Sequence, residues 1–207
     1  MEPTSTASAP AWQQIVDLWF GALDADGYAD GQHSAKWWKK DPAFDAMLRD
    51  RFESTHGEIV AGTCDAWLAE PAGRLAQVIV LDQFSRNMYR DTPGMYATDA
   101  LALRIAAAGI AAGADRTLAT AQRTFLYMPF MHSETLADQD RCVALFAAMR
   151  DELGGPAGER LTGNVKFAIA HRDIVARFGR FPHRNAILGR TSTAEELAFL
   201  DQPGSAF

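Results

Sequence analysis

The chain has 207 residues, of which 48% are hydrophobic and 22% charged, close to the average for folded globular proteins. This composition excludes a disordered or collagen-like chain, and the length predicts one helical domain, residues 11–207, after a disordered tail, residues 1–10. The net charge of −6 argues against nucleic acid or an anionic membrane surface as a partner. The most apolar run, residues 105–114, is too short to span a membrane. Two widely separated cysteines predict no disulfide framework, so we expect a cytoplasmic protein.

Helices dominate the expected structure. Alanine occurs 37 times against 15 valine and isoleucine residues together, a balance that favours helix over strand. Residues 21–34 are expected to form a Gly/Asp-rich loop, and Pro129 to break a helix. Eight or nine helices with short connections predict an all-α fold of antiparallel helical hairpins packed into one body. In chain order, apolar spacing and end signals predict helices over residues 12–20, 42–61, 75–84, 98–112, 118–128, 133–153, 161–178 and 193–200.

Three helix ends carry specific capping signals. Asp41 precedes Pro42, which is typical of an N-cap followed by proline at the first helical position. The segment 193–196 fits a capping box, because threonine is followed three residues later by glutamate. Gly179 follows the helix expected over residues 161–178 and is predicted to be its C-cap.

Basic residues are concentrated near the C-terminus. Residues 166–190 contain six basic residues and one acid, a local net charge of +5, so the rest of the chain carries −11. Such a segment either binds an anion or pairs its arginines with acids from other helices. The sequence leaves both interpretations open.

Two ionisable side chains are expected inside the protein. His171 falls on an apolar stripe with Phe167, Ile174 and Phe178, where a histidine is either a hydrogen-bonded core residue or a site residue. Asp82 lies in the most apolar helix of the chain. Because an unpaired buried carboxylate is costly, it needs a cationic partner, either Arg86 one turn later or an arginine between residues 177 and 190.

Polar residues also gather at three predicted helix ends. Arg86-Asn87 and Arg184-Asn185 each follow a phenylalanine, where guanidinium and free backbone groups can hold a carboxylate or phosphate, although helix capping explains them too. His132 and Glu134 follow the expected break at Pro129 and can face a cleft. The run Trp37-Trp38-Lys39-Lys40 suits base stacking beside phosphates, but in so acidic a chain we expect core tryptophans and solvated lysines.

Three segments, residues 81–90, 127–134 and 171–190, resemble the signature blocks of a bacterial family known as domain of unknown function 924. The resemblance extends from about Trp12 to Leu200, nearly the whole chain. It implies a tetratricopeptide-like helical fold, and it implies no activity, substrate or cofactor. The 34-residue tetratricopeptide pattern is not repeated here at a fixed period, so we expect helix-pair packing around a closed core and not an open repeat array.

The sequence supports three functional hypotheses. The first is a binding protein whose central pocket holds an anionic small molecule or a protein C-terminus. The second is a small hydrolase in which His171 or His132 is the general base with Glu134 or Asp82 as its partner; one version adds a divalent metal on these histidines, Glu134 and Asp173. The third is a scaffold with no ligand. No cofactor and no oligomeric state are predicted. The candidate binding residues are Asp82, Arg86, Asn87, His132, Glu134, His171, Arg180, His183, Arg184 and Asn185.

Overall fold

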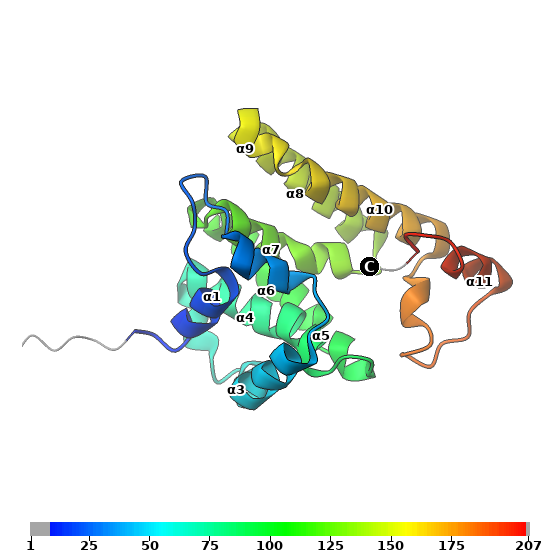
Figure 1. Ribbon diagram of the computed structural model, residues 1–207, viewed down its shortest axis with the longest axis horizontal. Coiled ribbons are helices and arrows are strands. Elements are labelled where there is room, and N and C mark those ends of the chain that lie inside the picture. The colour runs from blue at the N-terminus through cyan, green and yellow to red at the C-terminus, as the bar shows by residue number, and fades with distance from the viewer. Residues whose placement is uncertain (1–8, 206–207) are drawn as a thin grey trace, which may run out of the picture.

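The computed structural model describes residues 9–205, and over this range the protein is all-α, as predicted (Figure 1). Apart from one isolated bridge between Leu23 and Ala29, the described part of the chain contains no β-structure. None of its helices is long and apolar enough to cross a membrane. The expected disordered tail, residues 1–10, lies almost entirely outside the described residues.

The helices follow one another through short connections. The longer ones are α1 (Gln13–Phe20), α2 (Gly31–Trp37), α3 (Pro42–Val60), α4 (Pro71–Val78), α6 (Asp99–Ala111), α7 (Thr120–His132), α8 (Leu136–Leu153), α10 (Thr162–Phe178) and α11 (Ala194–Leu200). Shorter elements are α5 (Ser85–Met88), α9 (Gly155–Glu159) and the 3₁₀ turns η1 (Asp65–Ala69), η3 (Pro93–Tyr96), η4 (Ala114–Thr117) and η5 (Pro182–Arg184). The remaining element, η2 (Ile79–Phe84), is a π-helical segment.

Two expectations about local structure were wrong. The segment expected to be a loop over residues 21–34 contains the start of α2, because the Asp30 side chain accepts a hydrogen bond from the backbone N–H of His33 and so caps a new helix. Pro129 does not break its helix, since α7 continues to His132. The residues around this proline are buried, and their packing outweighs the one backbone hydrogen bond that proline removes.

The most buried helical stretch changes its winding in the middle. It runs without interruption from α4 through η2 to α5, and all six residues of η2 are buried. A π-helical turn holds an extra residue, which changes the direction in which the following side chains project, and such turns are frequent at functional sites. This segment carries Asp82, and the next turn carries Arg86.

The hydrophobic core lies in two parts. The larger part packs α1, α3, α4, α6, α7, α8 and the first half of α10 together and includes Trp19, Phe84 and Phe125. A small second cluster joins Ile174 and Val175 to Phe181 near α11. Figure 1 shows α10 running alongside α8, with the chain then turning back through η5 towards α11. α10 thus joins the larger core at its start and the small cluster at its end, and together with η5 it forms the C-terminal wall of the main helical body.

The predicted caps are all present. Asp41 accepts hydrogen bonds from the backbone N–H groups of Ala43 (3.0 Å) and Phe44 (3.2 Å) at the start of α3. Thr193 and Glu196 form the capping box of α11. Gly179 ends α10 in the left-handed conformation, with φ of 68°, which glycine adopts at little cost.

The cap of α3 gives a first prediction. Replacing Asp41 with alanine should lower the free energy of unfolding by about 1 kcal/mol, because two backbone N–H groups lose their acceptor. Urea denaturation measures the change. Asp50→Ala, at an exposed position within the same helix, is the control and should not destabilise the protein, because alanine favours helix. Equal effects of the two substitutions would contradict the assignment of the cap.

Candidate functional site

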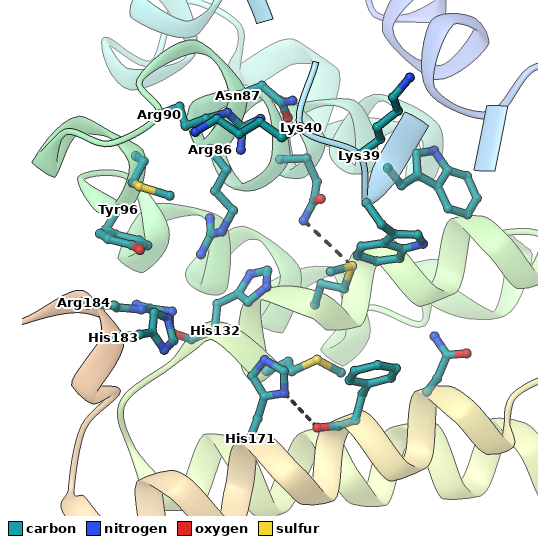
Figure 2. A pocket seen from close by; sticks show the side chains of 18 of the residues that line it. Lys39, Lys40, Arg86, Asn87, Arg90, Tyr96, His132, His171, His183 and Arg184 are labelled. Carbon is teal, nitrogen blue, oxygen red and sulfur yellow. Dashed lines mark hydrogen bonds between the residues drawn. The ribbon is translucent and has the colours of Figure 1, made fainter. Parts of the chain in front are cut away.

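A cavity of about 680 Å³ lies between the main helical body and the wall formed by α10 and η5 (Figure 2). Its volume is within the range of small-molecule sites. The α2–α3 connection, α5 and the end of α7 supply its other sides. Six of the ten residues predicted from the sequence line it: Arg86, Asn87, His132, His171, His183 and Arg184.

The lining has two chemically different parts. One part is apolar and consists of Trp37, Trp38, Met95, Met128, Met131, Phe146 and Phe167. The other part is basic, with five Lys or Arg side chains and three histidines: Lys39, Lys40, Arg86, Arg90, Arg184, His132, His171 and His183. No aspartate or glutamate is among the described lining residues. Trp38 and Phe167 are 67% and 58% exposed, which places them at the mouth of the cavity.

Asp82 lies beneath this lining and is fully buried. Its Oδ1 accepts hydrogen bonds from Arg86 Nη1 (3.0 Å) and His132 Nδ1 (2.7 Å), and its Oδ2 accepts one from Gln83 Nε2 (2.6 Å). Burial opposes ionisation of Asp82, but the charges and hydrogen bonds of these neighbours outweigh it and hold the pKa of the carboxyl well below its usual range. Of the two partners expected for Asp82, Arg86 or an arginine between residues 177 and 190, Arg86 is the one that pairs with it.

A second acid, Asp99 at the start of α6, joins two arginines. Arg86 donates to both of its carboxylate oxygens, at 2.9 and 3.0 Å, and Arg184 Nη1 donates to one of them at 3.2 Å. Arg184 Nη2 also donates to the backbone carbonyl of His132 (2.9 Å), and the ring of Tyr96 lies within 5.7 Å of both guanidinium carbons. Burial and the nearby Arg86 lower the pKa of Arg184. The two guanidinium groups are thus fixed beside each other at the cavity.

His132 is the last residue of α7 and presents its ring to the cavity (Figure 2). A carboxylate can only accept hydrogen bonds, so Nδ1 carries the proton that is donated to Asp82, and Nε2 holds a lone pair. Nε2 makes no hydrogen bond with any residue from 9 to 205 and is open to the cavity. Burial and Arg86 lower the pKa of His132, although Asp82 opposes this, so the imidazole is neutral at pH 7.

Two further histidines approach from the C-terminal wall. His171 on α10 donates from Nδ1 to the backbone carbonyl of Phe167 (2.8 Å), and burial lowers its pKa to about 3. His183 on η5 is also buried, and its pKa is lowered to about 4 by burial and by Arg184. The ring of Phe181 lies 5.6 Å from His171 and 5.5 Å from His183. Both imidazoles are therefore neutral at physiological pH.

The other predicted residues lie outside the lining. Asp82 lies beneath it, as described above. Glu134 binds Arg190 through both carboxylate oxygens, at 2.7 and 2.9 Å. Arg180 binds Glu196 in the same bidentate way, at 2.6 and 2.8 Å. Asn185 donates to a nearby serine hydroxyl at 3.0 Å. The contacts of Glu134, Arg180 and Asn185 stabilise the conformation of the C-terminal segment.

The basic segment 166–190 is thus used mainly for ion pairs. All five of its arginines pair with acids: Arg172 with Asp140 and Asp173, Arg177 with Glu195, Arg180 with Glu196, Arg184 with Asp99 and Arg190 with Glu134. Of the five, only Arg184 lines the cavity. The other four arginines form ion pairs outside the cavity, with acids of α8, α10, α11 and the connection between α7 and α8.

Sequence reasoning missed the aromatic and lysine side of the cavity. Trp37 packs against the edge of the core, as expected, and also lines the cavity, whereas Trp38 is exposed; Lys39 and Lys40 follow them at the same side of the cavity. Trp37 Nε1 donates to the carbonyl of Trp19 (2.9 Å), which fixes its indole. The tryptophan pair beside two lysines was visible in the sequence, but its position opposite α10 depends on contacts far along the chain. Phe167, expected in the core, is at the mouth of the cavity.

Comparison with known proteins identifies the family. Residues 15–204 match the model of a family described as bacterial protein of unknown function (DUF924). The chain belongs to this family. A solved structure of a protein of unknown function from Agrobacterium tumefaciens superposes with a TM-score of 0.76 at 39% sequence identity, covering 92% of this chain and 96% of that one. No curated protein matches.

In the part of this DUF924 protein that the structure describes, the cavity contains no cluster of metal ligands. Among the described residues, no group of three or more His, Cys, Asp or Glu side chains is placed to hold a metal ion. The metal-assisted hypothesis required Glu134 and Asp173 to meet two histidines. Glu134 instead binds Arg190, and Asp173 pairs with Arg172 at the surface.

Proposed function

We propose that this protein binds an amphipathic anion in the cavity: a carboxylate or phosphate attached to an apolar body. One observation carries the proposal. The lining combines five Lys or Arg side chains with an apolar wall and contains no Asp or Glu among its described residues, although the chain as a whole is acidic. An anionic head group would lie against the basic part and the apolar body against the tryptophans and methionines. An apolar peptide that ends in a free carboxylate has the same chemistry.

The acids of the site support this proposal by their position. Asp82 and Asp99 lie behind Arg86 and Arg184, where they offset the cost of burying two guanidinium groups and fix their orientation. Arg90 is held in the same way by Asp45, through hydrogen bonds of 2.7 and 2.9 Å. Donors that are already fixed lose little conformational entropy when a ligand binds.

Lys39 supplies an uncompensated positive charge at the α2–α3 connection. It lines the cavity and forms no ion pair with any other described residue, whereas the neighbouring Lys40 pairs with Asp91 at 3.3 Å. A long-range attraction for anions therefore remains after the buried arginines have been neutralised.

The apolar part of the cavity lining is suited to a ligand with a flexible apolar chain. Met128 and Met131 from α7 lie beside Phe146 and the two tryptophans. Methionine side chains are unbranched and polarisable, so they adapt to ligands of different shape. Because two of the five tryptophans line the cavity, ligand binding should change the intrinsic fluorescence.

Fluorescence titration with decanoate, decyl phosphate and a peptide with an apolar C-terminus tests the proposal. We expect at least one of these anions to bind and to change the tryptophan emission, while decanol, which has no charge, binds about tenfold more weakly. Arg184→Met should also weaken binding of the anion about tenfold, because one charged donor is lost.

Arg172→Met is the matched control. Arg172 is a surface arginine that pairs with two acids, but it does not line the cavity. It should leave the dissociation constant unchanged, and thermal melts of both variants show whether they fold. If Arg184→Met does not fold, Lys39→Gln replaces it with the same expected direction. Equal binding of decanol and decanoate, or equal weakening by the two arginine variants, would overturn the proposal.

A further inference from the structure

The floor of the cavity contains an aspartate–histidine pair with the arrangement of a general base. We infer that the protein hydrolyses acyl esters of the amphipathic acids it binds, with His132 as the catalytic base. This inference rests on the proposed function, since the bound carboxylate is then the product of the reaction. Nothing in the family description assigns such an activity.

The position of His132 is the first argument. Its Nδ1–H donates to Asp82 over 2.7 Å, which fixes the ring and the tautomer, and its Nε2 lone pair faces the cavity. Asp82 is itself held by Arg86 and Gln83, so the carboxylate cannot turn away. An aspartate in this role orients the imidazole and stabilises the imidazolium that forms during proton transfer. Asp82 is thus a positioning residue, and His132 is the group that touches the reactants.

The chemistry of the lining indicates water as the nucleophile. None of the described lining residues is serine, threonine or cysteine, and both cysteines are buried elsewhere. In the first step, His132 Nε2 takes a proton from water while the water oxygen bonds to the acyl carbon, and the carbonyl electron pair moves onto oxygen. In the second step, the C=O bond re-forms, the bond to the leaving oxygen or sulfur breaks, and the imidazolium returns its proton to that atom. The products are an acid and an alcohol or thiol.

The two arginines are placed to stabilise the negative charge of the intermediate. Arg86 donates to the same Asp82 oxygen as His132, at 3.0 Å, and Arg184 donates to the backbone carbonyl of His132 at 2.9 Å. Both guanidinium groups therefore lie next to the base and line the cavity that the acyl group would occupy. Fixed cationic donors at the point where charge develops are a large source of catalysis. The same groups would hold the product carboxylate.

A second aspartate–histidine pair in the chain provides a matched control. His33 Nδ1 lies 2.9 Å from Asp30, but His33 does not line the cavity and its side chain is 23% exposed, against 11% for His132. The Asp30 side chain is 44% exposed, whereas that of Asp82 is fully buried. The two pairs differ in access to the cavity, which is the property that the inference requires.

Hydrolysis of 4-methylumbelliferyl decanoate and of a decanoyl thioester, each measured against the spontaneous rate, tests the inference. We expect the full-length protein to hydrolyse at least one of them, and His132→Gln to lower kcat about 100-fold while leaving the dissociation constant for decanoate nearly unchanged. His33→Gln should retain the wild-type rate. In the wild type, kcat should fall only at a pH below the usual histidine range, because a neutral His132 is required.

The outcomes separate the inference from the proposed function. If decanoate binds but neither substrate is hydrolysed, or if His132→Gln keeps the wild-type rate, the hydrolytic role is overturned and the binding role stands. Loss of activity in His33→Gln as well as in His132→Gln would also overturn the role of the cavity pair. If none of the three anions binds, the proposed function itself fails.

Discussion

Arg86→Met is expected to lower the free energy of unfolding by about 3–5 kcal/mol, a large share of the stability of a typical domain. Methionine preserves much of the length of the side chain but removes its charge. Asp82, which is fully buried, then loses its ion-pair partner, and Asp99 keeps only Arg184. A buried carboxylate without a cationic partner is costly because it has left water without a compensating interaction. Urea denaturation of the wild type and the variant measures the difference.

Two further variants show whether charge or packing causes the loss. Arg172→Met removes an arginine that pairs with two acids at the surface and should have no measurable effect, since exposed ion pairs contribute little. The double variant Arg86→Met/Asp82→Leu removes both buried charges and should recover part of the stability lost in Arg86→Met alone. An equal loss in the single and the double variant would mean that packing of the arginine, and not its charge, is responsible.

Much of the fold was predictable from local features of the sequence. The excess of alanine over β-branched residues and the spacing of apolar side chains identify an all-α protein. Caps such as Asp41 and Gly179 fix helix ends because they satisfy backbone groups within one turn of the chain. The error at Pro129 arose where tertiary burial decided the outcome, and the error at α2 arose because the N-cap formed by Asp30 was not recognised in the sequence. The π-helical winding of η2 has no signature that could be read from residue types alone.

The site was predictable in part, for a related reason. The partner of Asp82 was found because Arg86 lies one helical turn away, a distance fixed by the helix itself. The contact between Asp82 and His132, 50 residues apart, depends on how η2 packs against the end of α7. The partners of the arginines in residues 166–190 depend on tertiary packing in the same way. The sequence therefore showed the local positive charge, but not which arginine side chains face the cavity and which pair with acids elsewhere. Of these arginines, only Arg184 faces the cavity.

The buried histidines should make the free energy of unfolding depend on pH below about 6.5. The pKa of His171 is lowered to about 3 and that of His183 to about 4, both mainly by burial, whereas an unfolded histidine titrates near 6.5. At pH values between the folded and the unfolded pKa of each histidine, the unfolded chain binds more protons than the folded one. The stability from keeping these rings neutral is therefore fully present above pH 6.5 and is lost as the pH falls towards 4.

Urea denaturation at several pH values between 7.5 and 5 measures this effect. Each such histidine contributes a slope approaching about 1.4 kcal/mol per pH unit below 6.5, so His171 and His183 together should account for a loss of about 3 kcal/mol between pH 6.5 and 5. His132 and His56, whose pKa values are also lowered by burial, add to this loss. Acids such as Asp82 and Glu134, whose pKa values are lowered by their arginine partners, do not titrate in this window. The slope therefore reports on the histidines.

The variant His171→Leu tests whether His171 contributes to the pH dependence of the free energy of unfolding. The variant removes one titrating group, so its stability should fall with pH less steeply than that of the wild type, whatever its stability at pH 7.5. A wild-type stability that stays constant from pH 7 to 5, or an unchanged slope in His171→Leu, would show that the ring is not kept neutral by burial.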